Sequence, residues 1–391
     1  MANNSDRSIV LTGATGFLGA FLMAGLLERG YRVTVLGRSS NGRSLVERVS
    51  SLTRWFGIHA DNRLSCVEAD FSKKHLGLDD HIYGSLCAHT GKLIHCASDT
   101  SFLERNRARV MEMNVKSISA LLEFAEDAAV EKFYYISSAY ASGIRDGICL
   151  ESPVTGGSFT NVYEESKAMA ENSVISACER TGIPLCILRP SIVFGHSGTG
   201  MALKFNALYY AVKSLLVIRD IFIKDILEQG GVRAGQWGFR LESDGMLRMP
   251  LGIRLKTMGI VNLVPVDYFV EAAMRIIEEP GSFGIYHITS DNPPEITALM
   301  EYAERFLHIR GIRLVLGSLA RNSELNPAEE LFNKFMEQYR PYLADTRSFD
   351  RSRIDRITGG LAVPPFHYEV FRRCMNYAVQ NNWGRINGFP C

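Results

Sequence analysis

The segment Ser8–Gly30, SIVLTGATGFLGAFLMAGLLERG, decides the fold, because a short apolar run is followed at once by a glycine turn and a long helical pattern. The run Ser8–Thr12 is typical of a buried strand, and Phe17–Arg29 is typical of a helix. A second strand is expected from Arg32. A strand, a glycine turn, a helix and a further strand predict a βαβ unit whose turn binds a phosphate group.

The three glycines of the turn each have a physical role. The first permits the tight turn, the second lets a pyrophosphate approach the backbone, and the third allows close packing of helix and strand. The start of the helix then offers unpaired N–H groups to the phosphates. We therefore predict a dinucleotide site, with loop contacts from Gly13, Thr15, Gly16, Phe17, Leu18 and Gly19.

The end of the second expected strand distinguishes between the two nicotinamide cofactors. NAD sites usually place an acidic residue there to bind the ribose 2′-hydroxyl. Residues 35–40 read VLGRSS and contain no acid. Arg38 suits the additional 2′-phosphate, and Arg43 can assist it, so we predict NADP(H). The ends of later strands complete the predicted pocket: Asp70 and Phe71 bracket the adenine, and Cys96, Ala97 and Ser98 let the cofactor lie against the backbone.

Short β-branched runs alternate with helical patterns through the first half of the chain, which predicts an α/β fold of the Rossmann type with a doubly wound parallel sheet. The expected strands are Ser8–Thr12, Arg32–Leu36, Leu64–Glu68, Lys92–Cys96, Lys132–Ser137 and Leu185–Arg189. The expected helices between them include Phe17–Arg29, Ser44–Phe56, Glu104–Asp127 and Val162–Thr181.

The alternation stops after Arg189. We predict that residues 1–195 form the NADP-binding domain and that sheet-like runs within 260–290 rejoin it. Residues 196–259 and 291–391 are expected to form a smaller, mostly helical substrate-binding cap. In that cap, the apolar stretch from Met201 to Leu227 is consistent either with an acyl tunnel or with ordinary core, and periodicity does not separate the two.

Tyr163 and Lys167 form a Tyr-x-x-x-Lys pair at the start of an expected helix, so both side chains project from one face. A lysine ammonium beside the phenol favours the phenolate, which predicts a lowered pKa for Tyr163. Ser138 ends the fifth expected strand, where its hydroxyl can bind a substrate carbonyl oxygen. Each feature is common by itself, but their order along the chain predicts a catalytic site.

With these features in this order, the sequence resembles the extended short-chain dehydrogenase/reductase superfamily. It is closest to the branch with fatty acyl-CoA reductases and the thioester reductase domains of carboxylic acid reductases and peptide synthetases. The similar segments lie within about residues 8–270 and read LTGATGFLG, HCASDTSF, MNVKSISALLEFA, YISSAYASG, FTNVYEESKAMAE, LRPSIVFGHSGTG and NLVPVDYF.

The resemblance implies that Ser138, Tyr163 and Lys167 are catalytic and that Asn114 supports the lysine through water. Tyr163 and Lys167 also contact the cofactor, since the lysine holds the nicotinamide ribose hydroxyls. Further implied contacts to the nicotinamide side are Pro190, Ser191, Ile192 and Val193, and the implied or candidate substrate contacts are Ser138, Ala139, His196, Ser197, Met201 and Phe205. Ser98 and Ser138 depart from the commoner alanine and threonine of the family, and the second change keeps the hydroxyl.

The implied reaction is hydride delivery from NADPH to a carbonyl, most simply an acyl thioester on CoA or an acyl carrier protein, giving an aldehyde and, after a second transfer, an alcohol. Three alternatives stay open. The first is an extended dehydrogenase acting on a ketone or secondary alcohol, and the second is a nucleotide-sugar epimerase or dehydratase. The third is a non-catalytic dinucleotide-binding module, which has no need of Ser138, Tyr163 and Lys167 together.

The bulk composition limits the partners. Among 391 residues, 43 Lys and Arg balance 42 Asp and Glu, which argues against nucleic acid. The eight cysteines are scattered and no metal-binding spacing occurs, so we expect a reducing compartment and no metal. The first residues, MANNSDR, do not resemble a signal peptide, and no stretch has the length of a membrane span. We expect a cytoplasmic monomer or homodimer with a small-molecule or acyl-thioester substrate.

Overall fold

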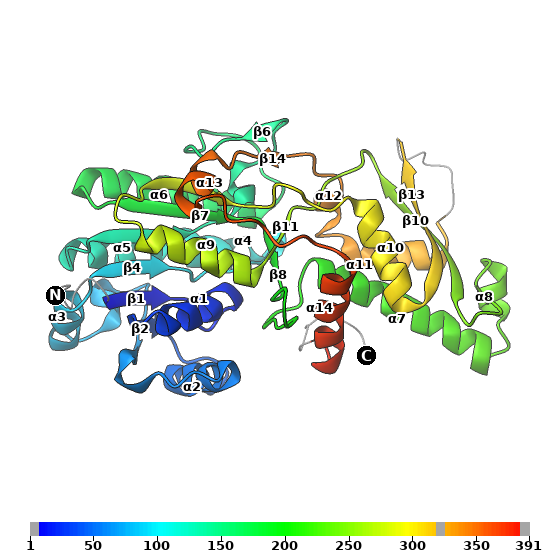
Figure 1. The fold of residues 1–391 in the computed structure, drawn as a ribbon, viewed down its shortest axis with the longest axis horizontal. Coiled ribbons are helices and arrows are strands. Elements are labelled where there is room, and N and C mark those ends of the chain that lie inside the picture. Colours follow the sequence, from blue (N-terminus) through cyan, green and yellow to red (C-terminus); the bar gives the residue numbers. More distant parts are fainter. Residues whose placement is uncertain (1–7, 318–324, 384–391) are drawn as a thin grey trace. The chain divides into compact units, whose positions relative to one another are not determined.

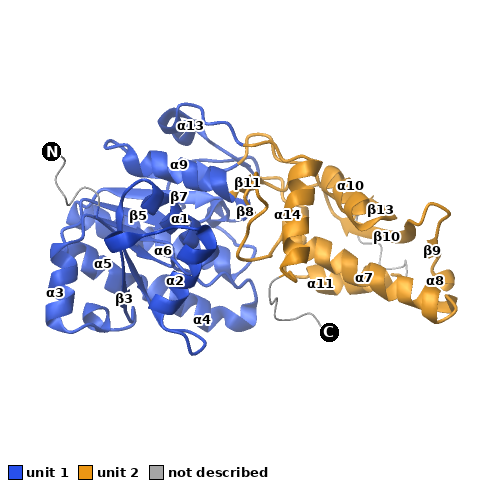
Figure 2. Cartoon of the chain, turned by 60° about the horizontal axis from the view of Figure 1, so that its bottom comes forward, with its two compact units in different colours: residues 1–193, 266–289, 348–363 blue, residues 194–265, 290–347, 364–391 orange. Residues whose placement is uncertain are grey.

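The computed structural model describes residues 8–317 and 325–383, so the MANNSDR segment and Cys391 lie outside the described residues. The chain forms two compact units (Figure 2). Unit 1 contains residues 1–193, 266–289 and 348–363, and unit 2 contains residues 194–265, 290–347 and 364–391. The boundaries differ from the expected ones in that residues 348–363 lie with unit 1 and residues 260–265 with unit 2.

Unit 1 is built on a seven-stranded sheet in the order β12-β7-β5-β4-β1-β2-β3, and every neighbouring pair is parallel (Figure 1). This confirms the predicted doubly wound sheet. The strands are β1 (Ser8–Thr12), β2 (Arg32–Gly37), β3 (Leu64–Glu68), β4 (Lys92–His95), β5 (Lys132–Ile136), β7 (Leu185–Pro190) and β12 (Gly284–Ile288).

Helices cover both faces of this sheet, as a parallel sheet requires. They are α1 (Phe17–Glu28), α2 (Leu45–Phe56), α3 (Asp80–Ala88), α4 (Arg107–Met111), α5 (Ile118–Asp127), α6 (Val162–Thr181), α9 (Val266–Glu278) and α13 (Ser352–Thr358). Helix α1 packs against α2 and α9, whereas α4 and α5 pack against α6. A small parallel pair, β6 (Ile148–Cys149) and β14 (Ser348–Phe349), joins residues far apart in the sequence.

The expected helix Glu104–Asp127 is interrupted in the structure. Between α4 and α5, residues Glu112–Lys116 form a π turn, the kind of one-turn irregularity that often occurs at functional sites. The turn contains the buried Asn114, whose side chain makes the hydrogen bonds described below. The apolar periodicity does not reveal a turn that is wider by a single residue.

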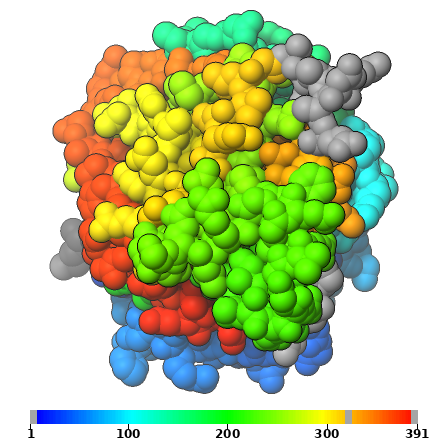
Figure 3. Space-filling model, turned by 90° about the vertical axis from the view of Figure 1, so that its right-hand side faces the viewer, coloured from blue at the N-terminus to red at the C-terminus, as the bar shows by residue number. Residues whose placement is uncertain are grey.

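Unit 2 combines helices with a three-stranded sheet in the order β13-β10-β9. Its elements are α7 (Leu208–Glu228), α8 (Val232–Gln236), β9 (Arg240–Leu241), β10 (Leu247–Leu255), α10 (Ile296–Leu307), β13 (Ile309–Leu316), α11 (Pro327–Met336), α12 (Arg340–Leu343) and α14 (Tyr368–Gln380). The short strands β8 (Ile192–Phe194) and β11 (Leu263–Pro265) lie near the sequence boundaries of the two units. The segment of α7 and α8 presents a broad surface, green in Figure 3.

The sheet of unit 2 is absent from the sequence-based expectation, which describes residues 196–259 and 291–391 as a mostly helical cap. Strand β10 contains Pro250 and Gly252, two residues that usually argue against a strand. Its pairing with β13 shifts register between Arg248 and Leu251, so an irregularity accommodates the proline. The helix expected from Met201 begins only at Leu208.

The glycine turn after β1 leaves no room for side chains at two positions. Gly13 has φ +75°, and a Cβ there would lie 2.5 Å from the backbone N of Ala97 on the loop after β4. A Cβ on Gly19 would overlap the carbonyl oxygen of Gly13. These two contacts bring α1 and the β4 loop against the turn, as the sequence predicts for a strand and helix in close approach.

Replacement of Gly13 by alanine is expected to lower the free energy of unfolding by about 1–3 kcal/mol, because the new Cβ is overpacked and the residue has a positive φ. Urea unfolding followed by circular dichroism measures the change. Gly84→Ala in α3 is the matched control, since a Cβ there meets nothing within 4 Å. Equal stability of the two variants would contradict this account of the turn.

Candidate active site

The site forms at the carboxyl ends of the central strands, where β1 meets β4 and the chain order of the sheet reverses. Ligands of open α/β sheets bind in the crevice at this point. Thr12 at the end of β1 bonds across it: its Oγ1 lies 2.7 Å from His95 Nδ1 and 3.3 Å from the backbone N of both Cys96 and Ala97. Thus the predicted cofactor residues Cys96 and Ala97 lie beside the glycine turn.

Arginine side chains gather where β2 ends and α2 begins. Arg48 Nη2 donates a hydrogen bond to Thr15 Oγ1 at 2.7 Å, and its Nη1 donates to the carbonyl oxygen of Arg38 at 2.9 Å. Burial, and then the positive charges of Arg43 and Arg38, lower the pKa of Arg48. The sequence-based prediction missed Arg48, because it lies a turn inside α2 rather than at the strand end. Arg38, Arg43 and Arg48 together are the arginine cluster.

Asp70 and Phe71, expected at the adenine, follow β3 closely. The Asp70 carboxylate accepts hydrogen bonds from Ser72 N and Oγ at 3.1 and 2.6 Å, and these bonds hold the pKa of Asp70 below its usual value. Phe71 is half-buried against the core beneath the sheet. Both residues shape the loop, and their contact with adenine stays a prediction.

Asn114 uses its whole side-chain amide in hydrogen bonds. Its Oδ1 accepts from Asp99 N at 2.7 Å and from Ser98 Oγ at 3.1 Å. Its Nδ2 donates to the Asp99 carbonyl oxygen and to Ser166 Oγ, each at 2.9 Å. Asn114 therefore ties the loop after β4 to α6 at the residue next to Lys167. The resemblance implies that Asn114 supports Lys167 through water, and the structure adds a direct hydrogen bond from Asn114 to Ser166, the residue before Lys167.

Tyr163 and Ser138 form a hydrogen-bonded pair, with the tyrosine at the start of α6 and the serine just after β5. Burial raises the pKa of Tyr163 well above its usual value, and the hydrogen bond with Ser138 offsets this only in part. We predicted a lowered pKa through Lys167, and this expectation is wrong for the structure, because removing the phenolate from water outweighs any nearby charge. Tyr163 therefore remains a neutral phenol.

Lys167 lies one helical turn further along α6 and is buried. Its Nζ donates to the carbonyl oxygen of Ile136 at 2.9 Å and lies 4.9 Å from the ring centroid of Tyr135. Burial lowers the pKa of Lys167 to about 8, against the opposing effects of Cys96 and Glu171. The ammonium is therefore held by a carbonyl and an aromatic face, with a full positive charge below that pH.

A buried ion pair fixes α6 on the sheet. Arg189, at the end of β7, bonds Glu171 of α6 through two contacts: Nε to Oε1 at 2.9 Å and Nη2 to Oε2 at 2.6 Å. The two side chains are 0% and 1% exposed. Arg189 Nη1 also lies 3.3 Å from His287 Nε2 on β12, and burial followed by the Arg189 charge lowers the pKa of His287 to about 4. The sequence contains no signal for this pairing.

The remaining predicted residues fall in two places. Ala139 is buried beside Ser138, and Pro190, Ser191, Ile192 and Val193 lie at the end of β7 and in β8. His196, Ser197, Met201 and Phe205 belong to unit 2, where His196 N bonds the Met201 carbonyl oxygen at 2.9 Å. Phe205 is buried and packs edge-on against Tyr209, as core residues do. The role of these four as substrate contacts stays a prediction.

The residues of unit 1 fit a dinucleotide cofactor. The buried hydroxyls of Ser137 and Ser191, at the carboxyl ends of β5 and β7, have no hydrogen-bond partner in the described part of the protein. Such hydroxyls cost free energy unless a ligand satisfies them. The turn at Gly13 has no side chain that would keep a pyrophosphate away from the backbone. The arginine cluster lies at the end of β2, where a cofactor ribose is bound in folds of this type.

Other site types find no support in residues 8–317 and 325–383. No group of three or more His, Cys, Asp or Glu side chains there could hold a metal ion. None of the seven cysteines in these ranges forms a disulfide. No helix in the same ranges is both long and apolar enough to cross a bilayer.

The parallel sheet and the glycine turn at its switch point form a fold of the extended short-chain dehydrogenase/reductase class. Residues 11–273 match the family described as "Male sterility protein", and the chain therefore belongs to that family.

Curated relatives agree with this class. The chain is 28% identical over 218 residues to NRPS-like oxidoreductase fscA of Fusarium equiseti. The matched region covers 55% of this chain and 21% of that protein. It is 29% identical to the L-2-aminoadipate reductase large subunit of Eremothecium gossypii (70% and 19% covered) and 24% identical to fatty acyl-CoA reductase 2 of Bos taurus (73% and 58% covered). The chain thus spans only a part of these proteins.

Solved structures share the fold. The terminal R domain from the myxalamid PKS-NRPS biosynthetic pathway superposes with a TM-score of 0.74 at 22% identity, covering 97% of this chain and 92% of that one. UDP-glucuronic acid 4-epimerase from Bacillus cereus, in complex with NAD, gives 0.64 at 14% identity, with 95% and 99% covered. At these identities the likeness concerns the fold alone.

Replacement of Glu171 by glutamine is expected to lower the free energy of unfolding by about 3–5 kcal/mol, because it leaves the Arg189 guanidinium buried without its counter-charge. Thermal and urea unfolding measure the effect. The control is Arg180→Ala, also in α6, which breaks the exposed pair with Glu126 of α5 (side chains 64% and 47% exposed) and is expected to cost less than about 1 kcal/mol. Similar losses in both variants would refute the central role of the buried pair.

Proposed function

We propose that the protein is an NADPH-dependent reductase of acyl thioesters, carried on CoA or on an acyl carrier protein. The observation that carries this proposal is the buried Ser138–Tyr163 hydrogen bond, with the Lys167 ammonium one helical turn away, at the edge of the sheet where the glycine turn lies. A non-catalytic binding module has no need of these three groups together.

The choice of NADPH rests on the arginine cluster. When bound, NADPH supplies the hydride. Arg48 is fixed between Thr15 of the glycine turn and the carbonyl of Arg38, so its charge is held next to the cofactor loop. Arg43 and Arg38 repel the positive charge of Arg48, and a doubly charged phosphate would relieve this repulsion. No carboxylate replaces them at the end of β2, residues 35–40.

The residues of the chain act on the substrate carbonyl. Ser138 and Tyr163 donate hydrogen bonds to its oxygen, where negative charge develops as the carbon is reduced. Tyr163 then gives its proton to that oxygen, and its raised pKa keeps it protonated and ready to do so. Lys167 stabilises the resulting phenolate through its charge and holds the ribose hydroxyls of the cofactor.

The thioester needs no nucleophile from the protein, because sulfur is already a good leaving group. Reduction of the carbonyl carbon gives a hemithioacetal, whose C–S bond breaks to release an aldehyde and a thiol, with the hydroxyl proton passing to the sulfur. This assignment is supported by the names of the relatives, which include a fatty acyl-CoA reductase and an L-2-aminoadipate reductase. Unit 2, with His196, Ser197, Met201 and Phe205, is proposed as the substrate-binding part.

The test of this function is NADPH oxidation with a panel of acyl-CoA and carrier-bound thioesters, aldehydes and ketones, combined with detection of the aldehyde and the free thiol. We expect thioester-dependent oxidation, and a loss of about 10²-fold or more in kcat for Tyr163→Phe, which removes the proton donor. Tyr140→Phe is the control, since Tyr140 lies near the site but has no proposed role. Turnover of ketones without thioesters, or full activity of Tyr163→Phe, would refute the proposal.

The cofactor preference is tested by Arg48→Ala. Loss of one charge-assisted contact to the 2′-phosphate is expected to raise KM for NADPH about tenfold or more and to leave KM for NADH unchanged. Arg54→Ala, at the exposed end of the same helix, serves as the control. Equal changes for the two cofactors would mean that the arginine cluster does not recognise the phosphate.

A further inference from the structure

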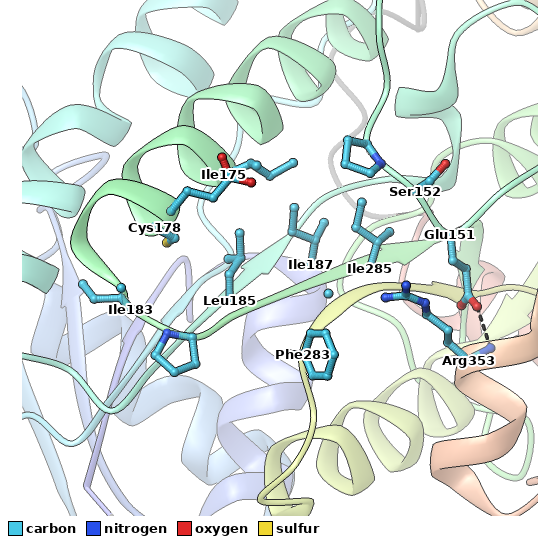
Figure 4. Close-up of a pocket in the computed structure, with 15 residues that line it drawn as sticks. Glu151, Ser152, Ile175, Cys178, Ile183, Leu185, Ile187, Phe283, Ile285 and Arg353 are labelled. Carbon is cyan, nitrogen blue, oxygen red and sulfur yellow. Dashed lines mark hydrogen bonds between the residues drawn. The ribbon is translucent and has the colours of Figure 1, made fainter.

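Unit 1 contains a groove of about 420 Å³ that is separate from the site described above. It lies over β7 and β12 at the C-terminal half of α6, and neither Ser138, Tyr163 nor Lys167 lines it (Figure 4). The groove is therefore independent of the reductase chemistry, although it shares the helix that carries Tyr163 and Lys167.

The floor of the groove is apolar. Ile187 of β7 and Ile285 of β12 are register partners and lie side by side. Leu185, two residues before Ile187, lies on the same face of β7. Ile175 of α6 closes one side. Phe283 stands at the rim with 68% of its surface exposed, so its ring is accessible to a ligand in the groove. These residues form a surface suited to an alkyl chain.

One end of the groove carries a positive charge without a partner. The Arg353 side chain is exposed, and within the described ranges its guanidinium makes no hydrogen bond or ion pair, although its main-chain N donates to Glu151 Oε2 at 2.6 Å (Figure 4). Gly284 has no side chain, and a Cβ there would overlap Arg353 Nη1, so the guanidinium lies directly against β12. The absence of a side chain at this position keeps the cation at the end of the apolar floor.

The acidic side chains of the groove do not cancel this charge equally. Both oxygens of Glu151 already accept main-chain hydrogen bonds, from His287 N at 2.7 Å and from Arg353 N. Burial raises the pKa of Glu151, against the opposing effect of these two hydrogen bonds. Glu179 of α6 also lines the groove and is exposed. The groove therefore has one cationic end and a long apolar floor.

The length of the floor indicates the size of the ligand. From Ile187 to Ile183 the chain advances four residues, roughly 13 Å at the rise of an extended strand. We propose that this groove binds a medium-chain fatty carboxylate, with the carboxylate on Arg353 and the alkyl chain over Ile285, Ile187 and Leu185 toward Ile183. The ligand contacts Ile175 and Cys178 and so binds the outer half of α6.

The test uses the full chain with a decanoate analogue that carries a photoreactive diazirine in its alkyl chain. We expect labelling of peptides that contain residues 183–187 or 283–285, with competition by decanoate but not by decanol. Arg353→Gln is expected to weaken decanoate binding, measured by calorimetry, about fivefold or more, because a charge-assisted contact is lost. Arg356→Gln, exposed on the same helix, is the matched control and is expected to bind as the unmodified protein does.

A second variant keeps the test independent of Arg353. Phe283→Ser shortens the apolar rim at an exposed position and is expected to weaken decanoate binding while leaving the Arg353 side chain in place. The proposal is overturned by labelling that lies outside the groove, by equal binding to the Arg353 and Arg356 variants, or by decylammonium that binds as tightly as decanoate and so pairs with Glu179. Because Tyr163→Phe leaves the groove intact, its unchanged decanoate binding separates this proposal from that of the reductase.

Discussion

The buried pair of Arg189 and Glu171 is the interaction on which the site depends. It is fully removed from water, and it joins β7 to the helix that presents Tyr163 and Lys167. Two charges in such a place are tolerated only when each is satisfied, and here two short hydrogen bonds and the neighbouring His287 do so. The helix is thereby fixed in position and rotation on the sheet, and Asn114 fixes its opposite side through Ser166.

Burial also sets the pKa values of Tyr163 and Lys167. Removing the side chains from water raises the pKa of Tyr163 and lowers that of Lys167 to about 8. The site then holds a neutral phenol beside an ammonium. A neutral phenol can donate a proton to the oxygen of a reduced carbonyl, whereas an alcohol oxidation requires a group that accepts one. In this respect the electrostatics favour the direction in which a reductase works.

The sequence was sufficient for the regular parts of this structure and insufficient for the irregular ones. β1 and β3 have the expected bounds, because buried parallel strands are short apolar runs between turns. β10 escaped notice, since Pro250 interrupts its pattern, and the π turn at Asn114 adds a residue that periodicity does not register. Arg48 and the Arg189–Glu171 pair depend on side chains that meet only after folding, which no local spacing reveals.

The most direct measurement of this account is the pH profile of kcat/KM for reduction. The proposed mechanism uses the charged form of Lys167, and burial lowers the pKa of Lys167 to about 8. Activity is therefore predicted to be constant well below that pH and to fall with each unit above it. The fall is expected to be absent from the residual activity of Lys167→Arg, whose guanidinium keeps its proton. A profile that stays level through pH 10 in the unmodified protein would contradict the account.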